Sequence, residues 1–285
     1  MSAWLDGGAG RLYTYTGGRP FDPQRPVIAF IHGAQHDHSV WILQSRFLAH
    51  HGFSVLAFDL PGHGRSEGEA ETSVEAIADR LAAALRRSQA RRVLLVGHSL
   101  GSLIALEVAR RQPTLAAGVA LVCTAFPMRV SDALLAAARS DLPAAMDMIN
   151  LWSFSASIAP FAARPSNPGP GFNVVWENLR LMQRIAERNG AGVLYRDFAA
   201  CNAYSGGIDA VKALNCPTLF VLSEADRMTP PQSAQALIEA AGEPQVVRIG
   251  HAGHALMAEA PEAVLGALSA FARRCLAPDA TQGSA

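Results

Sequence analysis

Ser99 stands between two glycines in the stretch Gly97-His98-Ser99-Leu100-Gly101. The apolar run Val93–Val96 leads into this stretch, and a helix-like pattern follows it. A sharp turn from a strand into a helix admits only small neighbours and exposes the serine hydroxyl above the sheet. The helix that starts there also directs its N-terminal amides and the positive end of its dipole at the hydroxyl. We therefore expect Ser99 to be a nucleophile.

A serine nucleophile needs a base to take its proton and an acid to orient that base. After a strand-turn-helix motif of this kind, the expected chain order is serine, acid, histidine. Asp226 follows the apolar run Thr218–Leu222, and His254 follows the last strand-like run, Gln245–Ile249. We expect His254 to be the base and Asp226 to orient it.

Two neighbouring residues are alternatives for these roles. Glu224 precedes Asp226 in the same loop, but it lies closer to the strand, so its side chain is expected to point away from the site. His251 shares the loop of His254. Because His254 follows Gly253 and precedes a helix start, we expect it at the crest of the loop and His251 to be an ordinary loop residue.

Acyl transfer at a serine also needs two donors for the oxyanion. The first is expected to be the backbone N–H of Leu100, directly after the nucleophile. The second should come from the loop that follows the apolar run Val27–Ile31, where Gly33 lets the backbone approach closely. We expect the Ala34 amide to be this donor, with Gln35 as the next candidate.

The histidines near this loop raise the question of a metal. His36-Asp37-His38 contains two histidines two residues apart, but the sequence shows no third clustered ligand and no His-Glu-x-x-His helix. We expect this segment to form a polar rim beside the substrate entrance, and His32 to hydrogen-bond within its own loop. The sequence therefore predicts no metal and no cofactor.

Strand-like and helix-like segments alternate along the chain. Continuous apolar runs are typical of strands that are covered on both faces, and such alternation predicts an α/β fold with a mostly parallel central sheet and helices on both faces. Thr72 and Glu75 have the spacing of a capping box at the start of one helix. The expected strands are 27–31, 53–58, 93–96, 117–122, 218–222 and 245–249, and three expected helices outside the central region are 72–85, 103–110 and 262–276.

The alternation stops between about residues 129 and 207, where no strand-like run occurs. Helix-like sequence covers 132–150, 174–189 and 193–204. We expect an inserted helical cap over the site, with a helical subdomain that does not contact substrate as the alternative. The predicted boundaries are core 1–128, cap 129–208, core 209–277 and a disordered tail 278–285.

Apolar side chains of the cap and the adjoining sheet edge predict a largely apolar substrate pocket. Most of them should pack the cap onto the sheet, and we expect no more than a third to touch a ligand. The set comprises Phe126, Met128, Trp152, Phe154, Phe161, Phe172, Trp176, Met182 and Tyr195. The expected substrate contacts are Phe126, Met128, Trp152 and Trp176, with Asn202 and Tyr204 as polar contacts.

Composition limits the partners. The 24 basic and 24 acidic side chains balance, so no overall field attracts nucleic acid or an anionic membrane. The longest apolar run has about twelve residues, which is too short to span a bilayer. The N-terminus lacks a secretory signal, and four scattered cysteines favour reduced thiols. We expect a cytoplasmic monomer or homodimer that acts on a small molecule.

Taken together, these motifs resemble the α/β-hydrolase superfamily, in the branch with a helical cap after the sixth strand. The resemblance implies that Ser99 is the nucleophile, His254 the base and Asp226 its acid. It also implies a supporting role for the segment around Asp59. The matching motifs are HG at 32–33, DLPGHGRS at 59–66, GHSLG at 97–101, SEADRMTP at 223–230 and GHALMAEAPE at 253–262.

Departures from related families narrow the expected chemistry. A serine at 99 argues against haloalkane dehalogenases and epoxide hydrolases, which use aspartate there. His98 and Ala255 differ from the residues typical of meta-cleavage hydrolases, and with Lys212 as the only lysine no Ser-x-x-Lys site exists. We expect a serine esterase for small or medium, largely apolar carboxylic esters. The alternatives are a C–C bond hydrolase or thioesterase with the same triad, or a non-catalytic ligand-binding protein of this fold.

Overall fold

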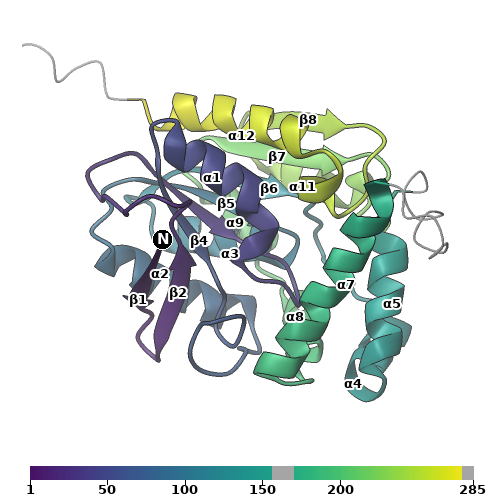
Figure 1. Ribbon diagram of the computed structural model, residues 1–285. Helices are drawn as coiled ribbons and strands as arrows, with labels where there is room; N and C mark the ends of the chain where they lie inside the picture. Colours follow the sequence, from purple (N-terminus) through teal and green to yellow (C-terminus); the bar gives the residue numbers. More distant parts are fainter. Residues whose placement is uncertain (156–169, 278–285) are drawn as a thin grey trace, which may run out of the picture.

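The computed structural model describes residues 1–155 and 170–277 of the chain (Figure 1). The tail predicted at 278–285 lies outside the described residues. Within them, one sheet has the strand order β1-β2-β4-β3-β5-β6-β7-β8. The strands are β1 (Ser2–Asp6), β2 (Arg11–Tyr15), β3 (Val27–Ile31), β4 (Ser54–Phe58), β5 (Val93–His98), β6 (Ala116–Val122), β7 (Thr218–Ser223) and β8 (Gln245–Ile249).

Six neighbouring strands, from β4 to β8, pair in parallel, which confirms the predicted mostly parallel sheet. Every residue of β3, β4, β5, β6 and β7 is buried, because helices cover both faces. Parallel strands bring their carboxyl ends to one edge of the sheet. The loops after β3, β5, β7 and β8, which carry the predicted site residues, therefore meet at that edge.

The strands β1 and β2 were not predicted from the sequence. They pair with each other in antiparallel fashion and extend the sheet beyond β4. In β1 the side chains alternate between exposed and half-buried, so this edge strand shows no continuous apolar run. The sequence rule that identified the central strands does not apply to a strand of this kind.

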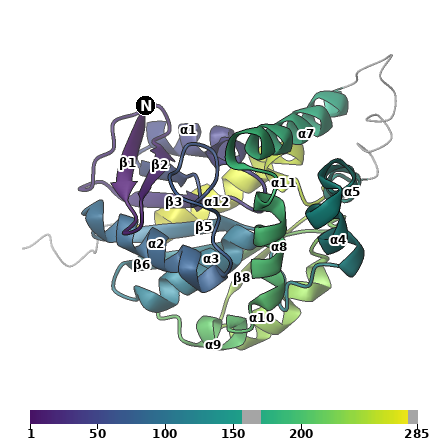
Figure 2. The same cartoon turned by 90° about the horizontal axis from the view of Figure 1, so that it is seen from below.

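Helices pack on the two faces of the sheet (Figures 1 and 2). One apolar cluster joins α2, α3, α9 and α10 to one face, and another joins α1, α11 and α12 to the other face. The helices are α1 (Ile42–His50), α2 (Val74–Arg87), α3 (Leu100–Arg111), α9 (Gly207–Lys212), α10 (Gln235–Ala240), α11 (Leu256–Glu259) and α12 (Pro261–Cys275), with short 3-10 turns η1 (His38–Trp41) and η2 (Pro231–Ala234).

The cap of α2 differs from the prediction. The helix begins at Val74, and the Ser73 hydroxyl accepts the hydrogen bond from the Ala76 amide. Thr72 is therefore one residue too early to cap the helix. The capping residue is the last one before the helix with an extended backbone, and here that residue is Ser73.

Four helices precede α9 in the described part of the chain between β6 and β7, where the sequence predicted no strand. They are α4 (Asp132–Ser140), α5 (Leu142–Ser153), α7 (Pro170–Asn189) and α8 (Val193–Ala203). These helices lie together at one side of the sheet (Figures 1 and 2), and an apolar cluster of their own includes Leu134, Met146, Met182 and Phe198. We refer to them as the cap helices; the division into core and cap remains a prediction. Across the described ranges, none of the helices combines the length and the apolar character needed to cross a membrane.

Candidate active site

Ser99 occupies a sharp turn between β5 and α3. Its backbone has φ 52° and ψ −123°, a conformation that non-glycine residues rarely adopt and that is often found at functional sites. The Ser99 amide donates to the Val122 carbonyl at 3.0 Å, which ties the turn to β6. A side chain on Gly97 would collide with the Gly101 carbonyl, and one on Gly101 would collide with the carbonyls of β3 and the loop after it. The two glycines are therefore required by packing.

This packing predicts the effect of adding one methyl group. Gly101→Ala should lower the free energy of unfolding by about 3 kcal/mol, because the new Cβ would overlap backbone atoms that cannot move independently. Gly266→Ala is the matched control, since Gly266 lies within α12 with open space around it, and alanine should stabilise the helix by about 0.5–1 kcal/mol. Equilibrium unfolding in urea measures both. Equal stability of the two variants would contradict the packing argument.

Asp226 and His254 are joined across the ends of β7 and β8. His254 Nδ1 lies 2.8 Å from Asp226 Oδ2, and both side chains are buried. A carboxylate accepts hydrogen bonds, so Nδ1 carries the hydrogen and Nε2 is left as the basic nitrogen. Ser99 and His254 both lie within the described ranges, and the Ser99 hydroxyl makes no hydrogen bond to the His254 ring. In ligand-free enzymes this contact is often long and tightens when substrate binds.

The two alternatives lie elsewhere. Glu224 is exposed, and its carboxylate makes no described contact with His254. His251 is exposed in the loop after β8, with a φ of 61°. Of the residues considered for the two roles, the structure brings together Asp226 and His254.

A turn after Asp226 fixes its carboxylate. Oδ1 accepts hydrogen bonds from the amides of Met228 and Thr229, both at 2.8 Å. The Thr229 hydroxyl lies 2.8 Å from Oδ2 and 3.2 Å from His254 Nδ1. Burial raises the pKa of Asp226, but the attraction and hydrogen bond of His254 and the bonds from Thr229 outweigh it, so the pKa lies below its usual value. Sequence reasoning missed Thr229; the signal was an Asp-x-x-Thr spacing directly after a strand.

Hydrogen bonds to Glu259 and to the end of α5 hold the loop that carries His254. Glu259 Oε1 accepts from the Gly253 amide at 2.8 Å, and Oε2 accepts from the Ser155 amide at 3.0 Å. The Ala255 amide donates to the Ser153 carbonyl at 2.9 Å. Glu259 was also missed, because a carboxylate at a helix end is ordinarily exposed and solvated.

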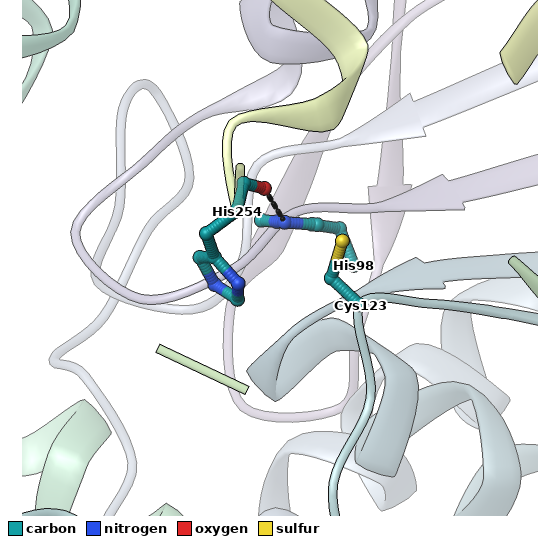
Figure 3. Close-up of side chains that lie close together, drawn as sticks. All are labelled: His98, Cys123 and His254. Carbon is teal, nitrogen blue, oxygen red and sulfur yellow. Dashed lines mark hydrogen bonds between the residues drawn. The ribbon is translucent and has the colours of Figure 1, made fainter. Parts of the chain in front are cut away.

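His98 and Cys123 lie beside His254 (Figure 3). His98 Nε2 is 2.9 Å from the His254 carbonyl, so it donates its hydrogen there. Burial lowers the pKa of His98 well below its usual value, which keeps the ring neutral. Burial and the Asp226 charge raise the pKa of the Cys123 thiol, so it stays protonated.

These three residues are close enough to share one metal ion. A metal needs a thiolate and free imidazole nitrogens. Here the thiol is protonated, His254 Nδ1 is bound to Asp226, and His98 Nε2 is bound to a carbonyl. The donor set fits a hydrogen-bonded support for the base better than a metal site.

Within the polar segment at 36–38, Asp37 and His38 form a second group that could reach a metal, together with Asp59. Its donors are engaged as well. His38 Nδ1 lies 2.6 Å from Asp59 Oδ1, and Asp37 Oδ1 accepts from the Ser39 amide at 2.8 Å and so caps η1. Asp59 Oδ2 accepts from the Arg65 amide at 2.8 Å. These bonds hold two neighbouring loops together.

His32 hydrogen-bonds within its own loop and to the loop after β4. Nδ1 lies 2.8 Å from the Gly33 carbonyl, and Nε2 accepts from the Leu60 amide at 3.0 Å. Burial lowers the pKa of His32 well below its usual value, in keeping with a neutral ring that has one donor and one acceptor. Its nitrogens are thus both used inside the protein.

The two oxyanion candidates in this loop differ. The Gln35 amide donates to Asp197 Oδ2 at 2.8 Å, so it is already occupied. Among the described residues, the amides of Ala34 and Leu100 have no acceptor. Ala34 also lines the same cavity as Ser99. The geometry therefore favours Ala34 over Gln35 as the second donor.

Two cavities adjoin the candidate active site. Ser99 lines one cavity, which has a volume of about 390 Å³, and His254 lines the other, which has a volume of about 540 Å³. The Ser99 cavity is lined by Ala34, Ser99, Met128, Arg129, Val130, Ser131, Leu134, Trp152, Phe198, Cys201, Arg227, Met228 and Thr229. The His254 cavity is lined by His36, by Phe154 and by residues of η1, α1, α5, α7 and α11, among them Leu43, Trp176, Leu181 and Met257.

The predicted substrate contacts fall into two groups. Met128 and Trp152 line the Ser99 cavity, and Trp176 lines the His254 cavity. The structure does not bring the other three to either cavity. They are Phe126, whose ring packs edge-on against Tyr204 at 6.0 Å between ring centroids; Tyr204, whose hydroxyl donates to Glu107 at 2.8 Å; and Asn202, which is exposed.

Sequence reasoning also missed two cavity residues. Arg129 and Arg227 line the Ser99 cavity, and neither makes an ion pair with a described carboxylate. Arg129 directly follows Met128 and Arg227 directly follows Asp226, so their places beside two predicted site residues were the signal that could have found them. Phe161 and the side chain of Phe172, both predicted around the pocket, lie outside the described residues.

Residues 28–267 match the sequence profile of the Alpha/beta hydrolase family. The chain belongs to this family. A pimeloyl-(acyl-carrier protein) methyl ester esterase of Methylococcus capsulatus is 35% identical over 39% of this chain, and the match spans only 40% of that esterase. A non-heme chloroperoxidase of Streptomyces lividans is 28% identical over 75% of this chain and 81% of its own length. The names of these two relatives give different activities.

The fold of this hydrolase is shared with solved structures. An esterase from Exiguobacterium antarcticum superposes with a TM-score of 0.80 at 15% identity, covering 96% of this chain and 100% of that one. An enol-lactonase from Burkholderia xenovorans superposes with a TM-score of 0.78 at 19% identity, covering 95% and 99%. At these identities the likeness establishes the fold alone.

Proposed function

We propose that this hydrolase cleaves carboxylic esters through an acyl-enzyme on Ser99. The observation that carries the proposal is the 2.8 Å bond between His254 Nδ1 and Asp226 Oδ2, at the same sheet edge as the strained Ser99 turn. The relatives support an ester substrate, since their names include a methyl ester esterase and a lipase.

The proposed reaction has two halves. Ser99 Oγ attacks the ester carbonyl while His254 Nε2 takes the hydroxyl proton, and the amides of Ala34 and Leu100 hold the oxyanion. The C–O bond then breaks, and the alcohol leaves with the proton from His254. Water, deprotonated by the same nitrogen, attacks the acyl group and releases the acid, which restores Ser99. Asp226 stabilises the imidazolium in both halves.

The cavities suggest where the two parts of an ester lie. The Ser99 cavity also contains Ala34, so the carbonyl and its acyl chain belong there. The alcohol must leave beside the nitrogen that protonates it, and the other cavity contains His254. Apolar side chains such as Met128, Trp152 and Phe198 dominate the wall of the acyl side, which favours small or medium, largely apolar acyl groups.

Two other functions remain candidates. The same triad could cleave a thioester or a C–C bond next to a carbonyl, since the oxyanion chemistry is shared. A ligand-binding protein of this fold would need none of the bonds that orient His254. Those bonds, from Asp226, Thr229 and Glu259, favour an enzyme.

A fluorophosphonate probe tests the proposal on the purified protein. The probe should label Ser99 within minutes, because only an activated serine reacts, and peptide mass spectrometry locates the adduct. Asp226→Asn protein, which keeps the serine but misorients the base, should label far more slowly. A folded protein that is never labelled would favour the binding protein.

A substrate panel then separates the enzymatic alternatives. The panel compares neutral p-nitrophenyl and methyl esters with a thioester, a vinylogous diketone and an ester whose acyl chain ends in a carboxylate. The carboxylate-bearing ester is included because Arg129 and Arg227 line the cavity assigned to the acyl group. The highest kcat/KM should fall on an oxygen ester; a higher value on the thioester or diketone would replace the proposed activity.

A further inference from the structure

The cap helices hold the loop that follows β3, which we name the oxyanion loop and define as residues 33–36. The Gln35 amide donates to Asp197 Oδ2 on α8 at 2.8 Å, and Gln35 Nε2 donates to the Met182 carbonyl on α7 at 3.0 Å. Gln35 is fully buried and has a φ of 55°, which a non-glycine residue keeps only where its surroundings impose it. The shape of this loop therefore depends on the cap.

A buried ion pair fixes the Asp197 carboxylate. His63 Nε2 lies 2.9 Å from Asp197 Oδ2, and both side chains are 1% exposed. His63 Nδ1 lies 3.0 Å from the Pro61 carbonyl, so both ring nitrogens face acceptors and both carry hydrogens. Burial lowers the pKa of His63, but the charge and hydrogen bond of Asp197 outweigh it and the pKa is raised. One carboxylate oxygen thus binds both the loop after β4 and the oxyanion loop.

The same helix also reaches the substrate side. Phe198 and Cys201, which follow Asp197 on α8, line the Ser99 cavity. An acyl group in that cavity would contact the helix that holds the oxyanion loop. No other described carboxylate bonds to this loop.

We propose that Asp197 is a positioning residue that aligns the Ala34 amide with the oxyanion. This inference rests on the proposed function, because it needs Ala34 to be an oxyanion donor. Such a donor must lie about 2.7–3.1 Å from the place that the oxyanion will occupy. Fixing the Gln35 N–H fixes the peptide that follows Ala34, and so it limits rotation of the Ala34 amide itself. Asp197 touches no reacting atom and exchanges no proton with the substrate.

Two substitutions separate positioning from mere burial of a charge. Asp197→Ala removes the acceptor for the Gln35 amide. It should lower kcat about 100-fold, the loss typical of one oxyanion donor, while KM changes less than about threefold. Asp197→Asn keeps an acceptor oxygen, which can accept hydrogen bonds from the Gln35 amide and from Nε2–H of a neutral His63 ring. It should keep kcat within about tenfold of the parent.

An oxyanion-specific ligand gives an independent readout. An alkyl boronic acid forms a tetrahedral adduct on the serine whose oxygen occupies the oxyanion site. Its affinity should fall in Asp197→Ala by about the same factor as kcat/KM. Glu107→Gln is the matched control, because Glu107 is another buried carboxylate, bound to Arg110 and Tyr204 away from the site. That variant should bind the boronic acid like the parent.

Hydrogen exchange on the parent protein keeps the test independent of how the variants fold. The Gln35 amide should exchange slowly in the intact chain, and amide exchange measured by mass spectrometry resolves the peptide that contains it. Exchange as fast as in an exposed loop would overturn the proposal. Parental kcat and boronic acid affinity in folded Asp197→Ala would overturn it as well. If instead Ser99→Ala remains active, the proposed function itself fails, which is a different result.

Discussion

Ser99→Ala protein should hydrolyse p-nitrophenyl esters on the order of 10⁶-fold more slowly than the parent. Losses of this size follow when the nucleophile of a serine triad is removed, because base and acid then have no hydroxyl to activate. The residual rate would come from the oxyanion donors and from binding. Steady-state kinetics with the purified variant measures the effect, and turnover at the parental rate would show that another group is the nucleophile.

The backbone at position 99 supplies the control for this experiment. With a φ of 52°, any residue that has a Cβ is strained there, whereas glycine is not. Ser99→Gly should therefore be as inactive as Ser99→Ala but more stable by about 1 kcal/mol, with the strain relief partly offset by the entropy of glycine in the unfolded chain. Urea unfolding of the two variants gives the difference. If alanine is the more stable, the turn is not strained.

Much of the fold could be predicted because its central strands are buried on both faces. Such strands appear in the sequence as unbroken apolar runs, as in Val27–Ile31 and Leu219–Leu222. The edge strand Ser2–Asp6 is only half-buried and has no such run. Burial on both faces, and not strand formation itself, is what the sequence pattern records.

The candidate triad could also be predicted, because each member lies directly after a strand in a fixed chain order. Its supports could not. Thr229 bonds to Asp226 across a local turn, while Asp197 reaches Gln35 over 162 positions of sequence. The substrate contacts did not divide in this way, because Trp152 and Trp176 on the cap helices line the cavities as Met128 does. Tyr204 instead faces Glu107, a pairing that only the packing of α8 on α3 creates.

Asp226→Asn should lower kcat about 10⁴-fold with the fold intact. The amide of asparagine can donate to His254 Nδ1, which would move the ring hydrogen to Nε2, where the nitrogen can no longer take the Ser99 proton. Glu224→Gln is the matched control, because Glu224 lies two residues away but is exposed. It should keep the parental kcat. A similar loss in both variants would show that the charge of the loop, and not the bond to the ring, determines activity.

The same substitution should change how stability depends on pH. The pKa of Asp226 is lowered in the folded protein, so the ionised carboxylate stabilises the fold at pH values above its unfolded pKa of about 4. That contribution is lost as the pH falls through the lower, folded value. The parent should therefore lose more stability than Asp226→Asn as the pH falls from about 6 to about 3, a range that spans the ordinary pKa of carboxylates. Urea unfolding at several pH values measures this difference. Parallel curves for the two proteins would mean that the pKa of Asp226 is not lowered on folding, so that its charge does not stabilise the folded protein.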